Sequence, residues 1–204
     1  MKNLIIKFIL SCIRKIFPLI CNVQEEYKRL EIECLPNKFK SCGENFYIKN
    51  LHHISGYKYI SIGKNFYAGK DLRIEAIDQY CFQTFNPNLI IGNNVSLEDN
   101  CHIGCINKII IEDGTMIASN VFISDHFHGD TSKINNEMPK YRQLTSKGEI
   151  KIGKNVWIGD GVCIMPGVTI GDNVIIGANS VVTKSFPKNC IIAGVPAIII
   201  KNLS

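Results

Sequence analysis

Two histidines, His126 and His128, stand at the start of a segment, residues 123–150, in which a regular sequence period stops. A neutral imidazole can take the proton of a hydroxyl group, so a histidine held at such a point is a candidate general base. His126 is favoured because it occupies the corner position of its repeat, while His128 is a rival base or an acceptor or loop contact. Asp125 and Glu98 are both candidates for orienting the His126 ring, and the spacing does not choose between them. The alternative for either histidine is a structural turn cap.

The scaffold for these side chains is a six-residue repeat. A strand alternates faces, so the first and fifth positions of each hexad can both point inward. The fourth position is almost always Asn or Gly, the residues that most readily adopt a positive φ. Three such corners close one triangular coil, and the pattern predicts a parallel β-solenoid. From residue 152 the hexads begin, without a slip, at Ile152, Ile158, Ile164, Ile170, Ile176 and Val182.

The repeat can be followed backward, with interruptions, to about residue 42. We therefore expect a helical or interfacial segment at residues 1–40 and a solenoid at 41–187. A loop at 127–149 leaves the solenoid, and residues 188–204 close its last coil.

The N-terminal sequence MKNLIIKFILSCIRKIFPLI combines apolar residues with Lys2, Lys7, Arg14 and Lys15. Its uninterrupted apolar run, Phe8 to Ile13, is too short to span a bilayer, and no signal-peptide cleavage site follows. Two interpretations remain open: a basic amphipathic helix on the inner membrane surface, or a packing helix.

Composition narrows the class of protein. The 23 basic and 18 acidic residues leave a net charge of +5, too small a basic excess to indicate nucleic-acid binding. The nine cysteines include no CxxC pair, which is typical of reduced thiols in a cytoplasmic protein and does not indicate a metal site. Histidines of neighbouring coils can also bind zinc, as in the gamma-class carbonic anhydrases, but the spacing of His102 and His126 is not a whole coil. We expect His52, His53 and His102 to face solvent or to pack.

The stretch IGKNVWIGDGVCIMPGVTIGDNVIIGANSVVTKSFPKNCIIAGVPA resembles the hexapeptide-repeat acyltransferases, in particular the galactoside and maltose acetyltransferases and the bacterial polysaccharide O-acetyltransferases. The resemblance covers about residues 60–201. It implies an all-β, left-handed parallel β-helix that uses acetyl-CoA and no metal. It also implies a homotrimer with its active sites between subunits.

The resemblance also assigns roles to single residues. It implies that His126 is the catalytic base and that Tyr67 and Gly69 lie in the acceptor segment, although Gly69 replaces an asparagine of the family. Ile198 likewise replaces a basic residue. Lys184 and Lys201 could equally be surface charges, whereas Trp157 is expected to point outward as the wall of a ligand site. The coenzyme contacts implied are Trp157, Gly159, Ala178, Thr183, Lys184 and, near the 3′-phosphate, Lys201.

The expected reaction is direct acetyl transfer to a sugar hydroxyl of a capsular polysaccharide, an O-antigen or another glycoconjugate. No Ser or Cys motif of the nucleophile-elbow kind indicates an acyl-enzyme. Alternatives are N-acetylation of an amino sugar nucleotide, O-acetylation of an antibiotic, or a catalytically silent solenoid that serves in assembly.

Overall fold

The computed structural model of the chain describes residues 2–130, 132, 134 and 136–203, and within the N-terminal helix it describes the side chains of residues 13 and 16–34. The chain forms two compact units, Met1–Leu35 and Pro36–Ser204. Among the described residues, no helix is both long enough and apolar enough to cross a membrane.

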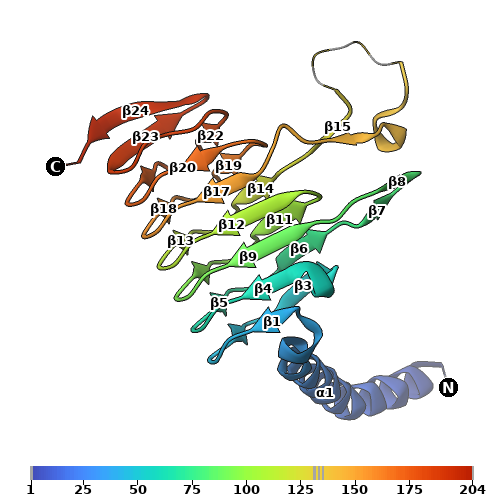
Figure 1. The fold of residues 1–204 in the computed structure, drawn as a ribbon. Coiled ribbons are helices and arrows are strands. Elements are labelled where there is room, and N and C mark those ends of the chain that lie inside the picture. The colour runs from blue at the N-terminus through green and yellow to red at the C-terminus, as the bar shows by residue number, and fades with distance from the viewer. Residues whose placement is uncertain (1, 131, 133, 135, 204) are drawn as a thin grey trace. The chain divides into compact units, whose positions relative to one another are not determined.

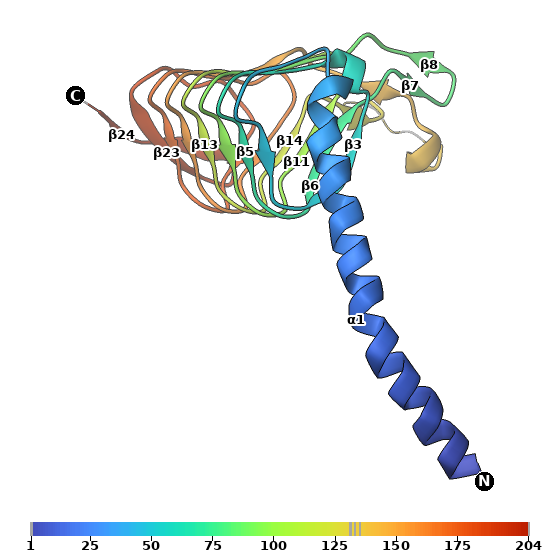
Figure 2. The same ribbon diagram turned by 90° about the horizontal axis from the view of Figure 1, so that it is seen from below.

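The first unit is one long helix, α1 (Lys2–Cys34), seen along its length in Figure 2. Pro18 lies inside it, and because proline has no backbone N–H the helix lacks one hydrogen bond there. Many large apolar side chains of its described part are about half exposed or more. They are Ile13, Ile16, Phe17, Leu19, Ile20, Val23, Tyr27 and Leu30.

The second unit is a solenoid in which three sheets of short parallel strands run along its length (Figure 1). Sheet A contains β1 (Ser41–Cys42), β4 (Ile60–Ile62), β9 (Asn88–Ile91), β12 (Lys108–Ile111), β17 (Ile150–Ile152) and β20 (Thr169–Ile170). Sheet B contains β2 (Tyr47–Ile48), β5 (Tyr67–Ala68), β10 (Ser96–Leu97), β13 (Met116–Ile117), β18 (Trp157–Ile158), β21 (Ile175–Ile176), β23 (Cys190–Gly194) and β24 (Ala197–Asn202). Sheet C contains β3 (Leu51–Ser55), β6 (Leu72–Ala76), β11 (His102–Cys105), β14 (Phe122–Ser124), β19 (Cys163–Ile164) and β22 (Val181–Val182).

The core is built by the two hexad positions predicted to point inward. In sheet C, Ile123 pairs in register with Ile103 on one side and Ile164 on the other, so equivalent side chains stack from coil to coil. Burying each such side chain stabilises the solenoid by about 1.5–3 kcal/mol. The fifth-position residues from residue 152 onward are buried as well: Val156, Val162, Val168, Val174, Ser180 and Phe186. The fold is the expected left-handed parallel β-helix.

The corners have the predicted left-handed backbone. Asn155 has φ 55° and Asn173 has φ 54°. The amide of Asn173 also donates from Nδ2 to Oδ1 of Asn189 one coil further on, at 2.9 Å. Asparagine therefore serves twice at a corner, since it tolerates positive φ and its side chain links adjacent coils. The other left-handed fourth positions in this stretch are Gly161, Gly167 and Asn179.

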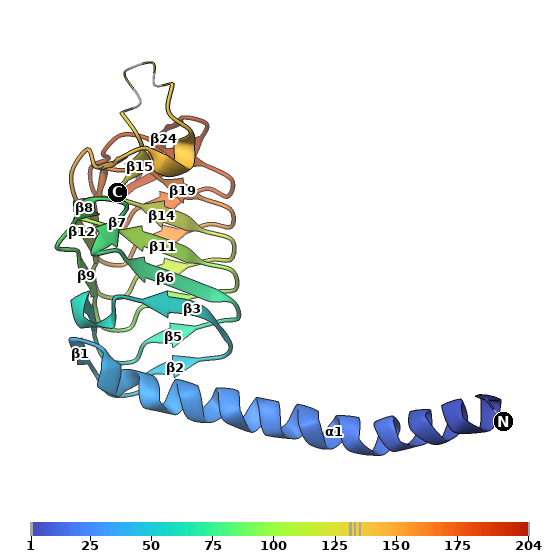
Figure 3. The ribbon, with the colours of Figure 1, turned by 90° about the vertical axis from the view of Figure 1, so that its right-hand side faces the viewer.

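Two excursions leave the solenoid between a strand of sheet C and the next strand of sheet A (Figures 1 and 3). After β6 comes an antiparallel hairpin of β7 (Gln79–Tyr80) and β8 (Gln83–Thr84). After β14 comes the expected long loop, in which β15 (Phe127–His128) pairs with β16 (Leu144–Thr145). At the C-terminal end, β23 and β24 pair antiparallel and close sheet B.

Three short 3-10 helices complete the described elements: η1 (Leu35–Lys38), η2 (Tyr57–Tyr59) and η3 (Pro139–Tyr141).

Candidate active site

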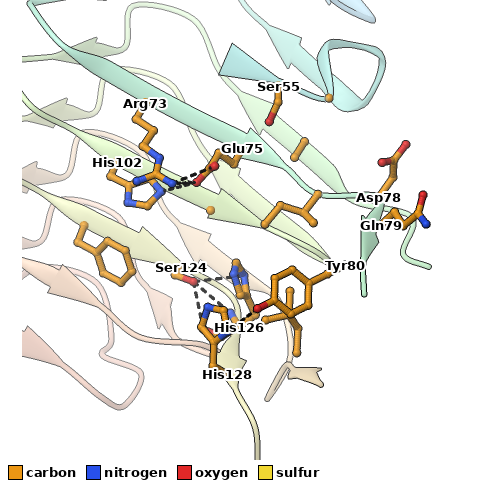
Figure 4. Close-up of a pocket in the computed structure, with 16 residues that line it drawn as sticks. Ser55, Arg73, Glu75, Asp78, Gln79, Tyr80, His102, Ser124, His126 and His128 are labelled. Carbon is orange, nitrogen blue, oxygen red and sulfur yellow. Dashed lines mark hydrogen bonds and ion pairs between the residues drawn. The ribbon is translucent and has the colours of Figure 1, made fainter. Parts of the chain in front are cut away.

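A cavity of about 620 Å³ lies where strands of sheet C end and the two excursions begin (Figure 4). Its walls come from the ends of β3, β6, β11 and β14, from the β7–β8 hairpin and from the start of the long loop. Both histidines singled out in the sequence, His126 and His128, line this cavity. The strands of sheet C and the segment that follows β14 thus place both histidines at the cavity.

Asp125, not Glu98, orients the His126 ring. The Asp125 side chain is fully buried, and its Oδ1 lies 3.1 Å from Nδ1 of His126. The same carboxylate accepts hydrogen bonds from the backbone N–H of Ile106, at 2.9 Å, and of Asn107, at 2.8 Å. An ionised carboxylate can only accept, so Nδ1 carries the hydrogen. The lone pair of Nε2 is therefore available to a substrate proton.

Ser124 holds the same imidazole from a second side. Its Oγ lies 3.3 Å from Nδ1 of His126, donates to the backbone carbonyl oxygen of His126 at 3.1 Å and accepts from the His126 backbone N–H at 3.3 Å. The His126 side chain is 11% exposed. The ring is therefore largely enclosed, and two neighbours along the chain hold it.

The sequence predicted only that His102 faces solvent or packs, and the structure gives it a more specific place. It lines the cavity, and its Nε2 lies 3.0 Å from Oε2 of Glu75. Arg73 joins the pair, with Nη2 2.9 Å from Oε2 of Glu75. The three come together because His102 is in register with Arg73, and Gly104 with Glu75, across β11 and β6. This cluster could have been recognised in the sequence from the polar residues at outward-facing positions of β6 and β11.

Burial and charge set the protonation of this cluster. Burial lowers the pKa of His102, and nearby Arg73 and His126 lower it further, against the opposing effect of Glu75. For Glu75, burial raises the pKa, but hydrogen bonds from Arg73 and His102 outweigh it and leave the pKa below its usual value. Glu75 is therefore a carboxylate near neutral pH, and His102 is a neutral imidazole.

Side chains of the β7–β8 hairpin hold the long loop by hydrogen bonds. Tyr80 of β7 lies with its hydroxyl 3.2 Å from Nδ1 of His128, and the same hydroxyl donates to the backbone carbonyl of Lys140. Gln83 of β8 both accepts from the backbone N–H of Leu144, at 2.7 Å, and donates to its carbonyl, at 3.2 Å. This hairpin was not predicted, although two hexads of the repeat begin at Ile74 and Ile91, and the interval between them is not a multiple of six.

The residues assigned to coenzyme lie elsewhere on the same chain. Trp157 is half exposed on sheet B, as predicted, and Thr183 and Lys184 are exposed beyond β22. Gly159 and Ala178 lie side by side on consecutive coils. A Cβ built on Gly159 would sit only 2.8 Å from the Ala178 nitrogen. None of these residues lines the His126 cavity as one chain forms it.

The remaining predicted residues also lie outside that cavity. Tyr67 stacks on Tyr47 on sheet B, with ring centroids 5.7 Å apart, and Gly69 packs closely against Asp99. Lys201 is exposed on β24. In a single chain Trp157 and Lys201 therefore lie on sheet B, away from His126, whereas Thr183 and Lys184 follow the sheet C strand β22, two strands along the sheet from β14.

The buried thiols of Cys101 and Cys105 lie outside this cavity. Cys105 is buried next to Asp125, and burial followed by that negative charge raises the pKa of its thiol. Burial likewise raises the pKa of Cys101 to about 11. Within the part of the chain that the structure describes, no three His, Cys, Asp or Glu side chains are grouped as metal ligands.

Comparison with known proteins places this chain and its fold in a family. Residues 149–184 match the family described as "Bacterial transferase hexapeptide (six repeats)". The chain is 42% identical over 147 residues to a putative lipopolysaccharide biosynthesis O-acetyl transferase, WbbJ, of Escherichia coli K12, covering 70% of this chain and 71% of that one. The chain belongs to the hexapeptide-repeat acyltransferases and is an acetyltransferase of that family.

Solved structures agree with this assignment. An N-acyltransferase from Bacillus cereus, AntD, in a D94N form bound to dTDP and coenzyme A, matches with a TM-score of 0.68 and 26% identity, over 89% of this chain and 90% of that one. A galactoside acetyltransferase bound to coenzyme A matches with a TM-score of 0.56 and 32% identity, over 84% of this chain and 69% of the other.

Proposed function

We propose that this protein transfers the acetyl group of acetyl-CoA to a sugar hydroxyl of a capsular polysaccharide, an O-antigen or another glycoconjugate. The observation that carries the proposal is the imidazole of His126, held by buried Asp125 with Nε2 available in a cavity large enough for a sugar ring. The similarity to a putative lipopolysaccharide O-acetyl transferase supports the acceptor class. The similarity to coenzyme A complexes supports the donor.

The proposed reaction needs no covalent intermediate on the enzyme. His126 Nε2 takes the proton as the acceptor oxygen attacks the thioester carbon, which forms a C–O bond and a tetrahedral intermediate. The intermediate collapses with cleavage of the C–S bond, and the imidazolium returns its proton to the departing thiolate of coenzyme A. Asp125 stabilises the imidazolium between these two steps because its carboxylate accepts the Nδ1 hydrogen. His128, two residues on and held by Tyr80, is placed to contact the acceptor.

We propose that a second copy of the chain completes the site. His126 follows β14 of sheet C, whereas Trp157 and Lys201 lie on strands of sheet B, and none of the residues assigned to coenzyme lines the His126 cavity. A homotrimer in which sheet B of one subunit faces the His126 cavity of the next would bring them together. A mass measurement that finds a fully active monomer would contradict this arrangement.

N-acetylation of an amino sugar nucleotide is the second candidate, and the similarity to an N-acyltransferase bound to dTDP favours it. The two functions separate in one assay, because an amine acceptor that is not consumed while a hydroxyl acceptor is consumed excludes N-acetylation.

We also propose that α1 lies on the inner surface of the cytoplasmic membrane, where a lipid-linked acceptor would be found. The exposed apolar residues Ile16, Ile20 and Val23 support this, because amphipathic helices bury such residues at the headgroup boundary. Sedimentation with vesicles that contain phosphatidylglycerol tests it. The triple substitution of Ile16, Ile20 and Val23 by Ser should abolish co-sedimentation, and unchanged binding would refute the assignment.

The proposed catalytic function is tested by replacing its base. His126→Ala should lower kcat about 10²–10⁴-fold, measured as release of free thiol from acetyl-CoA in the presence of a panel of sugars. His53→Ala, which changes an exposed histidine outside the cavity, is the matched control and should leave the rate unchanged. Wild-type turnover by His126→Ala would remove the mechanism.

A further inference from the structure

The wall of the cavity formed by β6 and β11 carries a second group of polar side chains beside His126. This group consists of Arg73, Glu75 and His102, whose hydrogen bonds are described above (Figure 4). The catalytic step assigned to His126 and Asp125 uses none of the three.

Gly104 separates the base from this group. A Cβ built on Gly104 would lie 3.1 Å from Cε1 of His126 and 3.9 Å from Nε2 of His102. The absence of a side chain at this position therefore leaves space between the two rings, above the floor of the cavity. A molecule whose hydroxyl reaches Nε2 of His126 has its neighbouring atoms over Gly104, next to the Glu75–His102 pair.

Glu75 can accept further hydrogen bonds. An ionised carboxylate has about four lone-pair sites. Those used here receive Nη2 of Arg73, which is shared between both oxygens, and Nε2 of His102. The Glu75 side chain is 22% exposed and borders the cavity, so a ligand can reach its remaining lone pairs.

Charge in the cavity favours a neutral ligand at this position. Among the described residues that line it, the positive side chain is Arg73, which is already paired with Glu75. Asp78 adds a negative charge that Lys58 balances at 3.2 Å. A phosphate or carboxylate placed beside Glu75 would meet a like charge, whereas a hydroxyl group would donate a hydrogen bond to it.

We propose that Glu75, held by Arg73 and His102, binds a second hydroxyl of the acceptor sugar and so decides which hydroxyl reaches His126. This inference rests on the proposed O-acetyltransferase function and adds its acceptor requirement: a neutral sugar with two neighbouring hydroxyl groups. Glu75 is then a specificity-determining residue, with His102 and Arg73 as positioning residues. This subsite lies on sheet C, away from the Tyr67–Gly69 segment on sheet B.

The test combines substitutions on both sides of the contact. The full-length protein is assayed with methyl glycosides of glucose, galactose, rhamnose and N-acetylglucosamine, and the fastest acceptor is then compared with its monodeoxy forms. In the wild type, one deoxy form that keeps the acetylated hydroxyl should lower kcat/KM about 10–100-fold, as expected for a lost hydrogen bond to a charged group.

In Glu75→Gln, kcat/KM for the parent sugar should fall by a similar factor. The same deoxy form should then lower kcat/KM by less than about threefold, because the contact is already weakened. Glu44→Gln, a change of an exposed glutamate outside the cavity, should keep the wild-type discrimination. If Glu75→Gln does not fold, Glu75→Asp withdraws the carboxylate by one methylene while keeping its charge, and it should show the same loss of discrimination.

The outcomes separate the two proposals. If the wild type acetylates a sugar but the effects of Glu75→Gln and of the deoxy forms simply multiply, the Glu75 subsite is wrong and the transferase function stands. If the wild type acetylates none of the sugars and binds none of them by saturation-transfer NMR, the proposed function fails and this inference fails with it.

Discussion

Replacing Asp125 separates its structural role from its role in orienting His126, the proposed base. Its carboxylate accepts from the backbone N–H groups of Ile106 and Asn107 and from Nδ1 of His126. Asp125→Ala leaves both N–H groups without this partner, at about 1–3 kcal/mol each. A total of about 4 kcal/mol corresponds to a fall in Tm of roughly 10 °C for a unit of this size. Differential scanning calorimetry measures it.

Asp125→Asn is the sharper change for catalysis. The amide keeps one oxygen as acceptor, but its NH₂ group must then face a backbone N–H or Nδ1 of His126. In either orientation the imidazolium loses the negative charge that stabilises it. We expect kcat to fall by up to about 10⁴-fold, the loss seen when a carboxylate that orients a catalytic histidine is changed to its amide. Ser124, also within reach of Nδ1, should keep the loss toward the lower end. Thiol release at saturating acetyl-CoA measures kcat.

Asp113→Asn is the matched control. Asp113 also accepts a backbone hydrogen bond between coils, from the N–H of Asn93 at 2.7 Å, but it lies outside the cavity. It should lose stability while keeping kcat. If Asp125→Asn loses stability yet keeps kcat within threefold of the wild type, Asp125 is a purely structural residue and the orienting role is refuted.

Three further predictions concern the cavity and its surroundings. Tyr80→Phe removes the hydroxyl that contacts His128 and Lys140, so it should raise the KM of the acceptor and speed proteolysis of the long loop, with little change in the KM of acetyl-CoA. The pKa of His102 is lowered in the folded protein, so the unfolded chain binds more protons below pH 6.5. The free energy of unfolding should therefore fall as the pH drops through this range, and His102→Gln should flatten this pH dependence. Cys101 and Cys105 should react with a thiol reagent only on unfolding, because both are buried with raised pKa values, and rapid labelling of either in the native protein would contradict their placement.

The six-residue period could be interpreted from the sequence alone because each of its columns has a local cause. An aliphatic first position must be buried, and an Asn or Gly at the fourth position accepts a positive φ wherever the coil turns. Both properties belong to single residues, so Ile164 and Asn173 could be assigned before any coil was placed on another. His126 was found in the same way, as a histidine at a corner where the period ends.

Only the tertiary structure decided which side chains of different coils meet. Neighbouring coils are offset by 18 positions between Asp172 and Lys154, by 20 between Asn120 and Asn100, and by 29 between Asn94 and Asn65, because excursions of different lengths lie between them. No fixed spacing could therefore place the pair of His102 and Glu75, 27 positions apart, in one cavity.

The choice of Asp125 over Glu98 was undecided in the sequence for a related reason. Asp125 is adjacent to His126, yet its carboxylate turns inward to two backbone N–H groups at the start of the β11–β12 turn, and from there it reaches Nδ1. That orientation depends on unpaired backbone donors of the previous coil, which a linear sequence does not display. Sequence thus determined the repeating scaffold and singled out His126, and the stacking of unequal coils determined which side chains surround it.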